Sequence, residues 1–166
     1  MNEKNSGELK PDVRIVGAQD WRVWRDLRLE GLADTPIGFA ELHADALAKS
    51  DEAWMDAMQW PGLRLMAFAG PDPDARPWGL AGGFHRGDVP ILFGVYVRPA
   101  VRGRGVLEAL VEVVRAWAAP EALTLDVHED NHRAHAAYLR LGFADTGERT
   151  SGGGIDGRDL LRMRAR

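Results

Sequence analysis

One segment constrains the fold most: a β-like run leads through a glycine-rich turn into an amphipathic helix. Residues 91–97 are rich in β-branched and aromatic side chains, which favour a strand. Gly103 and Gly105 follow in a turn. Beyond them, apolar residues recur at helical spacing and predict a helix with one buried face: Leu107, Leu110, Val111 and Val114. A strand, a glycine turn and a helix in this order indicate an α/β fold.

The turn before this helix has the chemistry of an anion site. Glycines let a backbone approach a ligand closely, and the first N–H groups of a helix have no partner within it. The helix dipole adds partial positive charge, and Arg102 and Arg104 add full charges. The segment therefore suits a diphosphate. It has neither the P-loop pattern nor the dinucleotide-binding glycine pattern, and a plain turn with exposed arginines would have the same composition.

A second segment, residues 125–143, predicts a strand followed by another helix. Asn131 precedes the helix as a cap, and Tyr138 lies seven residues later, two turns along the same face. Gly142 stands where a left-handed residue ends many helices. Taken alone, Asn131 is equally well a plain cap, and Tyr138 a plain core residue.

The rest of the chain predicts short strands and helices within one domain. We expect a helix over residues 21–32 with Val23, Trp24 and Leu27 facing the core, and another that Ser50 or Asp51 caps and that stops before Pro61. The predicted strands are residues 13–16, 63–69, 78–85, 91–97, 123–127 and 159–163. Residues 1–10 are expected to form a disordered leader, so the predicted domain is residues 11–166, a single mixed α/β unit.

The composition excludes several classes of function. The chain contains no cysteine, which excludes disulfides, thiolate metal sites and a cysteine nucleophile. Its net charge of −4 argues against nucleic-acid binding. The sequence has no apolar run of membrane-spanning length and no signal peptide, so we expect no membrane partner and a cytoplasmic location. Residues 1–60 hold 12 acidic and 7 basic residues, an excess that would attract a cationic substrate or simply face solvent.

The two motifs, in this order and at this separation, resemble the GNAT superfamily of acyl-coenzyme A-dependent N-acyltransferases. The family's phosphate loop reads Gln/Arg-x-x-Gly-x-Gly/Ala, and residues 102–107 read Arg-Gly-Arg-Gly-Val-Leu, with Leu107 in place of the last small residue. The family's later pattern is matched by Asn131, Ala134, Tyr138, Gly142 and Phe143. The resemblance is specific over residues 95–143 and covers most of the chain.

The resemblance implies a GNAT-like fold: a mixed central sheet, flanked by helices, with a splayed strand pair at the acyl-coenzyme A site. It implies acetyl-coenzyme A as co-substrate, with main-chain groups holding the pantetheine arm and the diphosphate. The residues it places around this co-substrate are Val95, Tyr96, Val97, Arg102, Gly103, Arg104, Gly105, Val106, Leu107, Glu108 and Asn131.

The resemblance also implies direct transfer of the acetyl group to an amine. Tyr138 matches the family's general acid, and a phenol stays protonated at neutral pH. Asp126 is the first candidate for the general base, and His85 the second, because histidine titrates in a suitable range. The spacing of His128, His132 and His135 invites a metal site, but the family motif here needs none, so we expect no metal.

The expected acceptor is a primary amine of a small molecule or a peptide. Glu30, Asp34 and Glu41 are candidates to line its pocket by their family location alone. A homodimer is expected from family habit. Two alternatives stay open. One is a non-catalytic acyl-coenzyme A-binding module of the same fold, which Leu107 would favour. The other is a nucleotide-binding regulatory domain, which is disfavoured because this sequence has no acidic ribose-binding residue at the required spacing.

Overall fold

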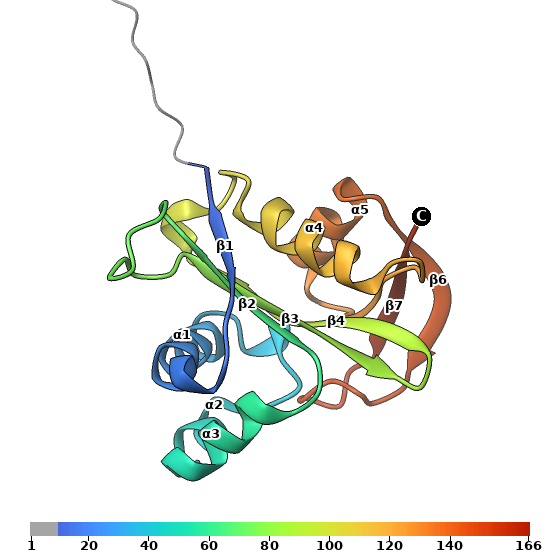
Figure 1. The fold of residues 1–166 in the computed structure, drawn as a ribbon. Coiled ribbons are helices and arrows are strands. Elements are labelled where there is room, and N and C mark those ends of the chain that lie inside the picture. Colours follow the sequence, from blue (N-terminus) through green and yellow to red (C-terminus); the bar gives the residue numbers. More distant parts are fainter. Residues whose placement is uncertain (1–9) are drawn as a thin grey trace, which may run out of the picture.

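Seven strands form one mixed sheet with helices on both faces, as the computed structural model shows for residues 10–166 (Figure 1). Across the sheet the order is β1-β2-β3-β4-β5-β7-β6. The strands are β1 (Asp12–Ile15), β2 (Leu63–Phe68), β3 (Gly79–Arg86), β4 (Val89–Val97), β5 (Thr124–His128), β6 (Phe143–Thr150) and β7 (Leu160–Ala165). The helices are α1 (Trp21–Asp34), α2 (His43–Leu47), α3 (Asp51–Gln59), α4 (Val106–Ala118) and α5 (His132–Arg140), with short 3-10 turns η1 (Ala18–Asp20), η2 (Pro36–Gly38) and η3 (Pro99–Val101). The predicted α/β class is confirmed.

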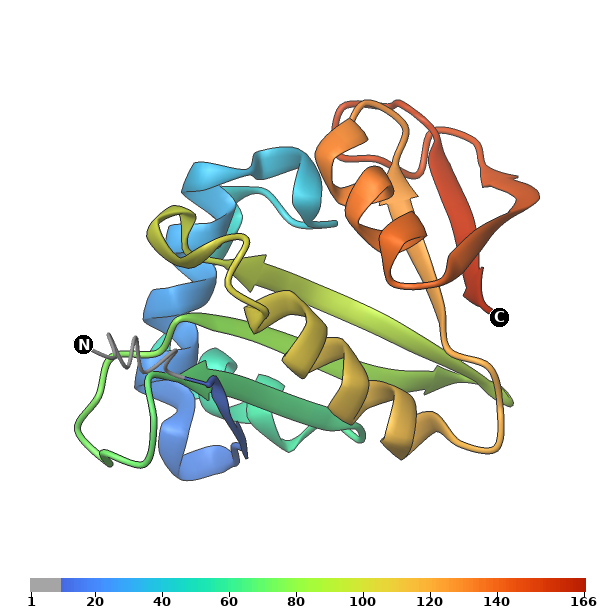
Figure 2. The same ribbon diagram turned by 90° about the horizontal axis from the view of Figure 1, so that it is seen from above.

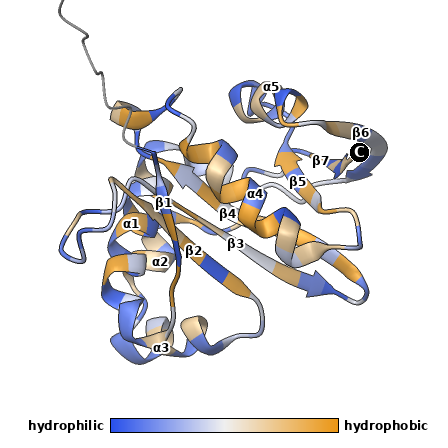
Figure 3. Cartoon of the chain, turned by 45° about the horizontal axis from the view of Figure 1, so that its top comes forward, coloured by the Kyte–Doolittle hydropathy of each residue, from blue (hydrophilic) through white to orange (hydrophobic). Residues whose placement is uncertain are grey.

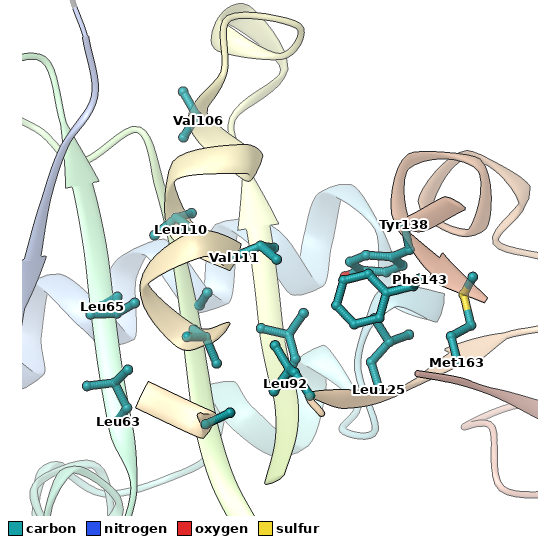
Figure 4. Packing of buried hydrophobic residues seen from close by; sticks show 14 of the residues in the cluster. Leu63, Leu65, Leu92, Val106, Leu110, Val111, Leu125, Tyr138, Phe143 and Met163 are labelled. Carbon is teal, nitrogen blue, oxygen red and sulfur yellow. The ribbon is translucent and has the colours of Figure 1, made fainter. Parts of the chain in front are cut away.

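Two apolar cores lie on opposite faces of the sheet, because side chains alternate along each strand. One core packs against α4 and α5 and takes Leu92 from β4 and Leu125 from β5 (Figure 4). The other packs against α1 and α3 and takes Tyr96 from β4. Coloured by hydropathy, α4 carries its apolar residues toward the sheet (Figure 3). The sheet is therefore the shared wall of both cores.

The apolar stripe of α1 differs from the prediction at one position. Trp21, Trp24 and Leu27 are buried, at i, i+3 and i+6, whereas Val23 is 43% exposed. Successive residues of a helix are about 100° apart around the axis, so a residue next to Trp24 turns away from the stripe. Placing Val23 in the core was wrong.

The two middle strands of the sheet diverge. Within the described residues, β4 and β5 pair in parallel at a single position, Ile91 with Thr124. Beyond this pair β4 bulges: Leu80 of β3 faces Tyr96 and Gly82 faces Phe93, which leaves two residues of β4 opposite one residue of β3. Gly94, in the bulge, has φ +63°, a conformation that favours glycine. Viewed from above, β4 (yellow-green) and β5 (orange) open into a V (Figure 2).

Local signals set the ends of several helices. The Asn131 side chain accepts a hydrogen bond from the Ala134 N–H at 3.3 Å, as an N-cap does. Gly142 follows α5 with φ +83°, and Ser50 caps α3. None of the helices over residues 10–166 is long and apolar enough to cross a membrane. The predicted leader, residues 1–10, lies outside the described residues except for Lys10.

Candidate active site

A cleft of about 240 Å³ lies in the V between β4 and β5. Most of the residues that the sequence assigned to a cofactor or to catalysis line it: Val95, Tyr96, Val97, Arg102, Gly103, Val106, Leu107, Glu108, Asp126, Asn131 and Tyr138. Of the residues assigned to the cofactor, Arg104 and Gly105 do not line it. The two sequence motifs, one from each arm of the V, therefore meet at a single cleft.

The glycine turn leads into α4 at one end of this cleft. Gly103 has φ +73° and Gly105 has φ +78°, and Gly105 is the N-cap of α4. A β-carbon added at either glycine would meet no atom within 4 Å, so the backbone conformation, not crowding, favours glycine here. The first N–H groups of α4, those of Val106, Leu107 and Glu108, have no partner within the helix. Open space beside a row of free N–H groups fits a diphosphate.

The arginines of this turn differ in their surroundings. Arg102 donates from Nε to the Val97 carbonyl at 3.0 Å and from Nη2 to Asp34 at 2.5 Å. Arg104 is exposed. The Thr35 hydroxyl and the Arg102 guanidinium hold the pKa of the Asp34 carboxyl below its usual value. Arg102 therefore ties the turn to the end of α1, while Arg104 faces solvent.

Leu107 follows the N-cap of α4 by two residues, where the family has a small residue. Its side chain is half-buried and packs against the core under α4, and it also lines the cleft. The backbone N–H of Leu107 stays available at the helix start, because that group needs no particular side chain.

Tyr138 reaches the cleft from α5. Its ring extends from α5 toward β4 and lies edge-on to the Phe143 ring at 5.7 Å between centroids (Figure 4). Only 8% of Tyr138 is exposed. Burial raises the pKa of the Tyr138 phenol, so this group stays protonated at neutral pH. Tyr138 therefore presents a neutral O–H donor to the cleft.

Asp126 lines the cleft from β5. Its neighbours Leu125 and Val127 belong to the core under α4, so the Asp126 side chain lies on the opposite face of the sheet. Arg162 of β7 donates to both carboxylate oxygens, from Nε at 3.0 Å and from Nη2 at 3.3 Å. These bonds with Asp126, more than any other interaction, raise the pKa of Arg162. Asp126 is thus a fixed anion at the edge of the cleft.

His85, the second candidate base, does not line the cleft. It is exposed, and its ring lies 4.7 Å from the Trp117 ring of α4. Asp126 faces away from α4, so the two candidate bases lie on opposite faces of the sheet.

Of His128, His132 and His135, whose spacing suggested a metal site, His128 is buried. Its Nε2 lies 2.7 Å from an Asp156 carboxylate oxygen, and its Nδ1 accepts a hydrogen bond from the Asp130 N–H at 3.1 Å. These three side chains lie close enough to share an ion. However, both ring nitrogens already have hydrogen-bond partners, so the contacts describe a link between β5 and the loop before β7. The hydrogen bond with His128 is the main cause that lowers the pKa of the Asp156 carboxyl.

Several residues that line the cleft were missed by the sequence reasoning. The start of α5 contributes Arg133, and Ala137 and Arg140 follow along the same face. Ala137 and Arg140 follow Arg133 by four and seven residues, which is the spacing of one helix face, so their position beside Tyr138 could have been predicted from the sequence. Thr35 and Phe39 come from the irregular segment after α1, which has no periodicity to show which residues face inward. Arg133 donates to the Thr35 hydroxyl at 3.2 Å, which joins α5 to this segment across the cleft.

A model of the acetyltransferase (GNAT) family matches residues 20–143. The chain is 35% identical over 65 residues, 39% of its length, to a 5-NmdU N-acetyltransferase of Pseudomonas phage PaMx11. It is 39% identical over 61 residues, 35% of its length, to an aminoglycoside N(6')-acetyltransferase type 1 of Acinetobacter genomosp. 13. The matched stretches cover 46% and 42% of those relatives. The solved structure of a GCN5-related N-acetyltransferase from Kribbella flavida shares the fold, with a TM-score of 0.70 and 24% identity over 96% of this chain and 98% of that one.

Proposed function

Because the chain belongs to the acetyltransferase (GNAT) family, we propose that it transfers an acetyl group from acetyl-coenzyme A to a primary amine of a small molecule or a peptide. The observation that carries the proposal is the V between β4 and β5. It brings the free N–H groups of α4 and the Tyr138 hydroxyl to one cleft. An anion site and a proton donor along one cleft suit a thioester that is carried on a diphosphate.

The donor would be held mainly by main-chain groups. The N–H groups of residues 103–108 would bind the diphosphate, and the edge of β4 at residues 95–97, which β5 leaves unpaired, would bind the pantetheine arm. Acetyl-coenzyme A supplies the acetyl group in activated form, as a thioester. Main-chain binding tolerates Leu107, because the loop contributes its N–H and not its side chain.

The chemical step requires a neutral amine. Its nitrogen attacks the thioester carbonyl, the new C–N bond forms, and the C–S bond then breaks. Tyr138 donates its proton to the departing sulfur. Two protons leave the nitrogen when an alkylammonium, whose pKa is near 10.4, becomes a neutral amide. The proton lost after attack replaces the one that Tyr138 gives to sulfur, and the other must leave before attack to produce the neutral amine. We assign that proton to Asp126 through an intervening water, with Arg162 holding the carboxylate in place.

The test is release of free thiol from acetyl-coenzyme A in the presence of a panel of primary amines. The proposal predicts amine-dependent release, and it predicts that Tyr138→Phe keeps acetyl-coenzyme A binding but loses most of the release. If the protein binds acetyl-coenzyme A but releases no thiol with any amine of the panel, the result favours the non-catalytic acyl-coenzyme A-binding module.

Two further expectations belong to this proposal. If the protein is a homodimer, analytical ultracentrifugation will give a mass of twice the chain mass of 18.3 kDa. A cytoplasmic location is tested by fractionating the cells that produce the protein.

A further inference from the structure

The face of the V opposite α4 has a defined set of side chains. A β-carbon on Gly83 would meet Trp117 and Val114 of α4, whereas one on Gly82 would meet the Phe93 ring, so Phe93 lies on the face away from α4. Asp126 shares that face. Ile91 pairs with Thr124. Phe93 follows Ile91 by two residues on β4, and Asp126 follows Thr124 by two residues on β5. The two side chains are therefore equally far along their strands from the point where the strands diverge. We call this surface the acceptor face; its residues are Arg28, Phe84, Phe93, Asp126 and Arg162.

Four acids on or around this face are paired with cations. Glu30 accepts two hydrogen bonds from Arg98, each of 2.8 Å, and Asp34 is paired with Arg102. Glu41 is paired with both Arg28 and Lys49. Asp126 is paired with Arg162 and, at 3.5 Å, with Arg86. These four acids therefore offer no unpaired negative charge, and a polycationic acceptor would meet the competing arginines.

Arg28 keeps part of its guanidinium free. Its Nε and Nη2 donate to one oxygen of Glu41, at 3.3 and 3.2 Å. Its Nη1 lies 3.1 Å from where a β-carbon of Gly94 would be, beside the bulge of β4. Among the described residues, none accepts a hydrogen bond from Nη1. The guanidinium also lies over the Phe39 ring, 5.2 Å from its centroid, and Phe39 lines the cleft. A cationic donor group thus faces the point where the strands part.

Two aromatic rings complete the face. Phe84 and Phe93 pack edge to face with 5.5 Å between centroids, and both are half-buried. The Arg86 guanidinium lies 5.8 Å from the Phe84 centroid. Rings flanked by guanidinium groups offer apolar contact and anion binding side by side.

We propose that the acceptor is an amine that also carries a carboxylate, such as an amino acid with an apolar or aromatic part, and that Arg28 determines this specificity. The inference rests on the proposed acetyl transfer and names its acceptor class. The Nη1 group of Arg28 binds the carboxylate beside Gly94, and the Phe84–Phe93 pair contacts the apolar part. Polyamines and other polycations are poor acceptors.

Matched acids and amides test this proposal. The rate of thiol release is measured for L-phenylalanine against L-phenylalaninamide and for para-(aminomethyl)benzoate against para-(aminomethyl)benzamide, with each rate expressed per neutral amine, and for spermidine. We expect kcat/KM to favour the acid by about tenfold or more in at least one pair, as a charge-assisted hydrogen bond would give. A preference for the amides in both pairs, or for spermidine, overturns the proposal.

Two variants separate Arg28 from the general charge of the region. Arg28→Gln should remove the preference for the acid mainly through KM, while Lys49→Gln, which removes the other cation on Glu41, should keep it. Arg28→Lys serves as a milder change if Arg28→Gln unfolds at a lower temperature. An unchanged preference in folded Arg28→Gln contradicts the assignment, because this variant has no cation at position 28.

Failure of the proposed transfer gives a different result. In that case no amine releases thiol, although acetyl-coenzyme A still binds. Titration of the coenzyme A-loaded protein with para-(aminomethyl)benzoate and with the benzamide then decides the carboxylate site alone. Tighter binding of the acid supports the site, and equal or weaker binding overturns it.

Discussion

Ile91 of β4 and Thr124 of β5 form the single backbone pair that, among the described residues, joins the two strands lining the cleft. From this point the strands diverge, and the bulge at Gly94 turns β4 further from its antiparallel course along β3. One arm of the V leads to the glycine turn and the other to the start of α5. The parallel pairing of β4 and β5 ends after one residue pair. The cleft that opens beyond it brings together residues more than 30 positions apart in sequence, such as Gly103 and Tyr138.

Tyr138→Phe tests the proton donor. The ring keeps its edge-to-face contact with Phe143, and the lost hydroxyl has no hydrogen-bond partner among the described residues, so the folded protein should be as stable as before. We expect kcat to fall about 100-fold or more while the dissociation constant for acetyl-coenzyme A changes little. Steady-state kinetics and calorimetry measure the two quantities. An unaltered kcat would reduce Tyr138 to a packing residue.

Gly103→Glu tests the diphosphate site. Gly103 lines the cleft with φ +73°, so any side chain there costs about 1 to 2 kcal/mol of backbone strain. Gly103→Ala is the matched control, because it introduces the same strain without the charge. We expect acetyl-coenzyme A to bind the alanine variant and not the glutamate variant in a calorimetric titration. Equal binding by both would place the diphosphate elsewhere.

Leu107→Ala tests whether the departure from the family pattern obstructs the site. The half-buried side chain packs against the core, so its loss should lower the free energy of unfolding by about 1 to 2 kcal/mol. Binding of acetyl-coenzyme A should change by less than about threefold, because the backbone N–H remains. Urea unfolding and calorimetry give the two values. Binding that tightens about tenfold would show that Leu107 crowds the cleft.

The Asp34–Arg102 pair predicts a pH dependence of stability. The pKa of Asp34 is lowered in the folded protein, first by the Thr35 hydroxyl and then by Arg102. A carboxyl with a lowered folded-state pKa contributes stability above its unfolded pKa of about 3.9, and that contribution is lost as the pH falls through the folded-state value.

Asp34→Asn, which removes the charge at nearly constant shape, measures this contribution. The free energy of unfolding of the original protein should exceed that of the variant at pH 7, and the difference should shrink between about pH 5 and pH 2. Urea unfolding across this range provides the measurement. A difference that stays constant with pH would mean that the carboxylate charge is not involved.

Much of the fold was predictable because its signals are local. The periodicity of α4, the cap at Asn131 and the positive φ of Gly142 all follow from residues within one or two turns. Val23 is apolar, which suggests a core position, but its angle around the helix places it outside the buried stripe. The divergence of β4 from β5 has no such signal: residues 95–97 are as β-like as any paired strand, so only the family resemblance implied the V.

The residues of the cleft could be predicted where they belong to a sequence motif. The side-chain pairings around the cleft could not, because they depend on tertiary contacts. Gly103 of the glycine turn and Tyr138, one from each motif, both line the cleft. The pairing of Asp126 with Arg162 links β5 to β7, and that of Glu41 with Arg28 links the segment after α1 back to α1. Sequence gives no distance between such charges, so neither the fixed Asp126 nor the free Nη1 of Arg28 was foreseen.

Calorimetric titration of the protein with acetyl-coenzyme A tests whether the V between β4 and β5 is a thioester-binding cleft. We expect saturable binding of one molecule per chain with a dissociation constant in the micromolar range, abolished in Gly103→Glu and retained in Gly103→Ala. No detectable heat with the original protein, or equal binding by both variants, would contradict it.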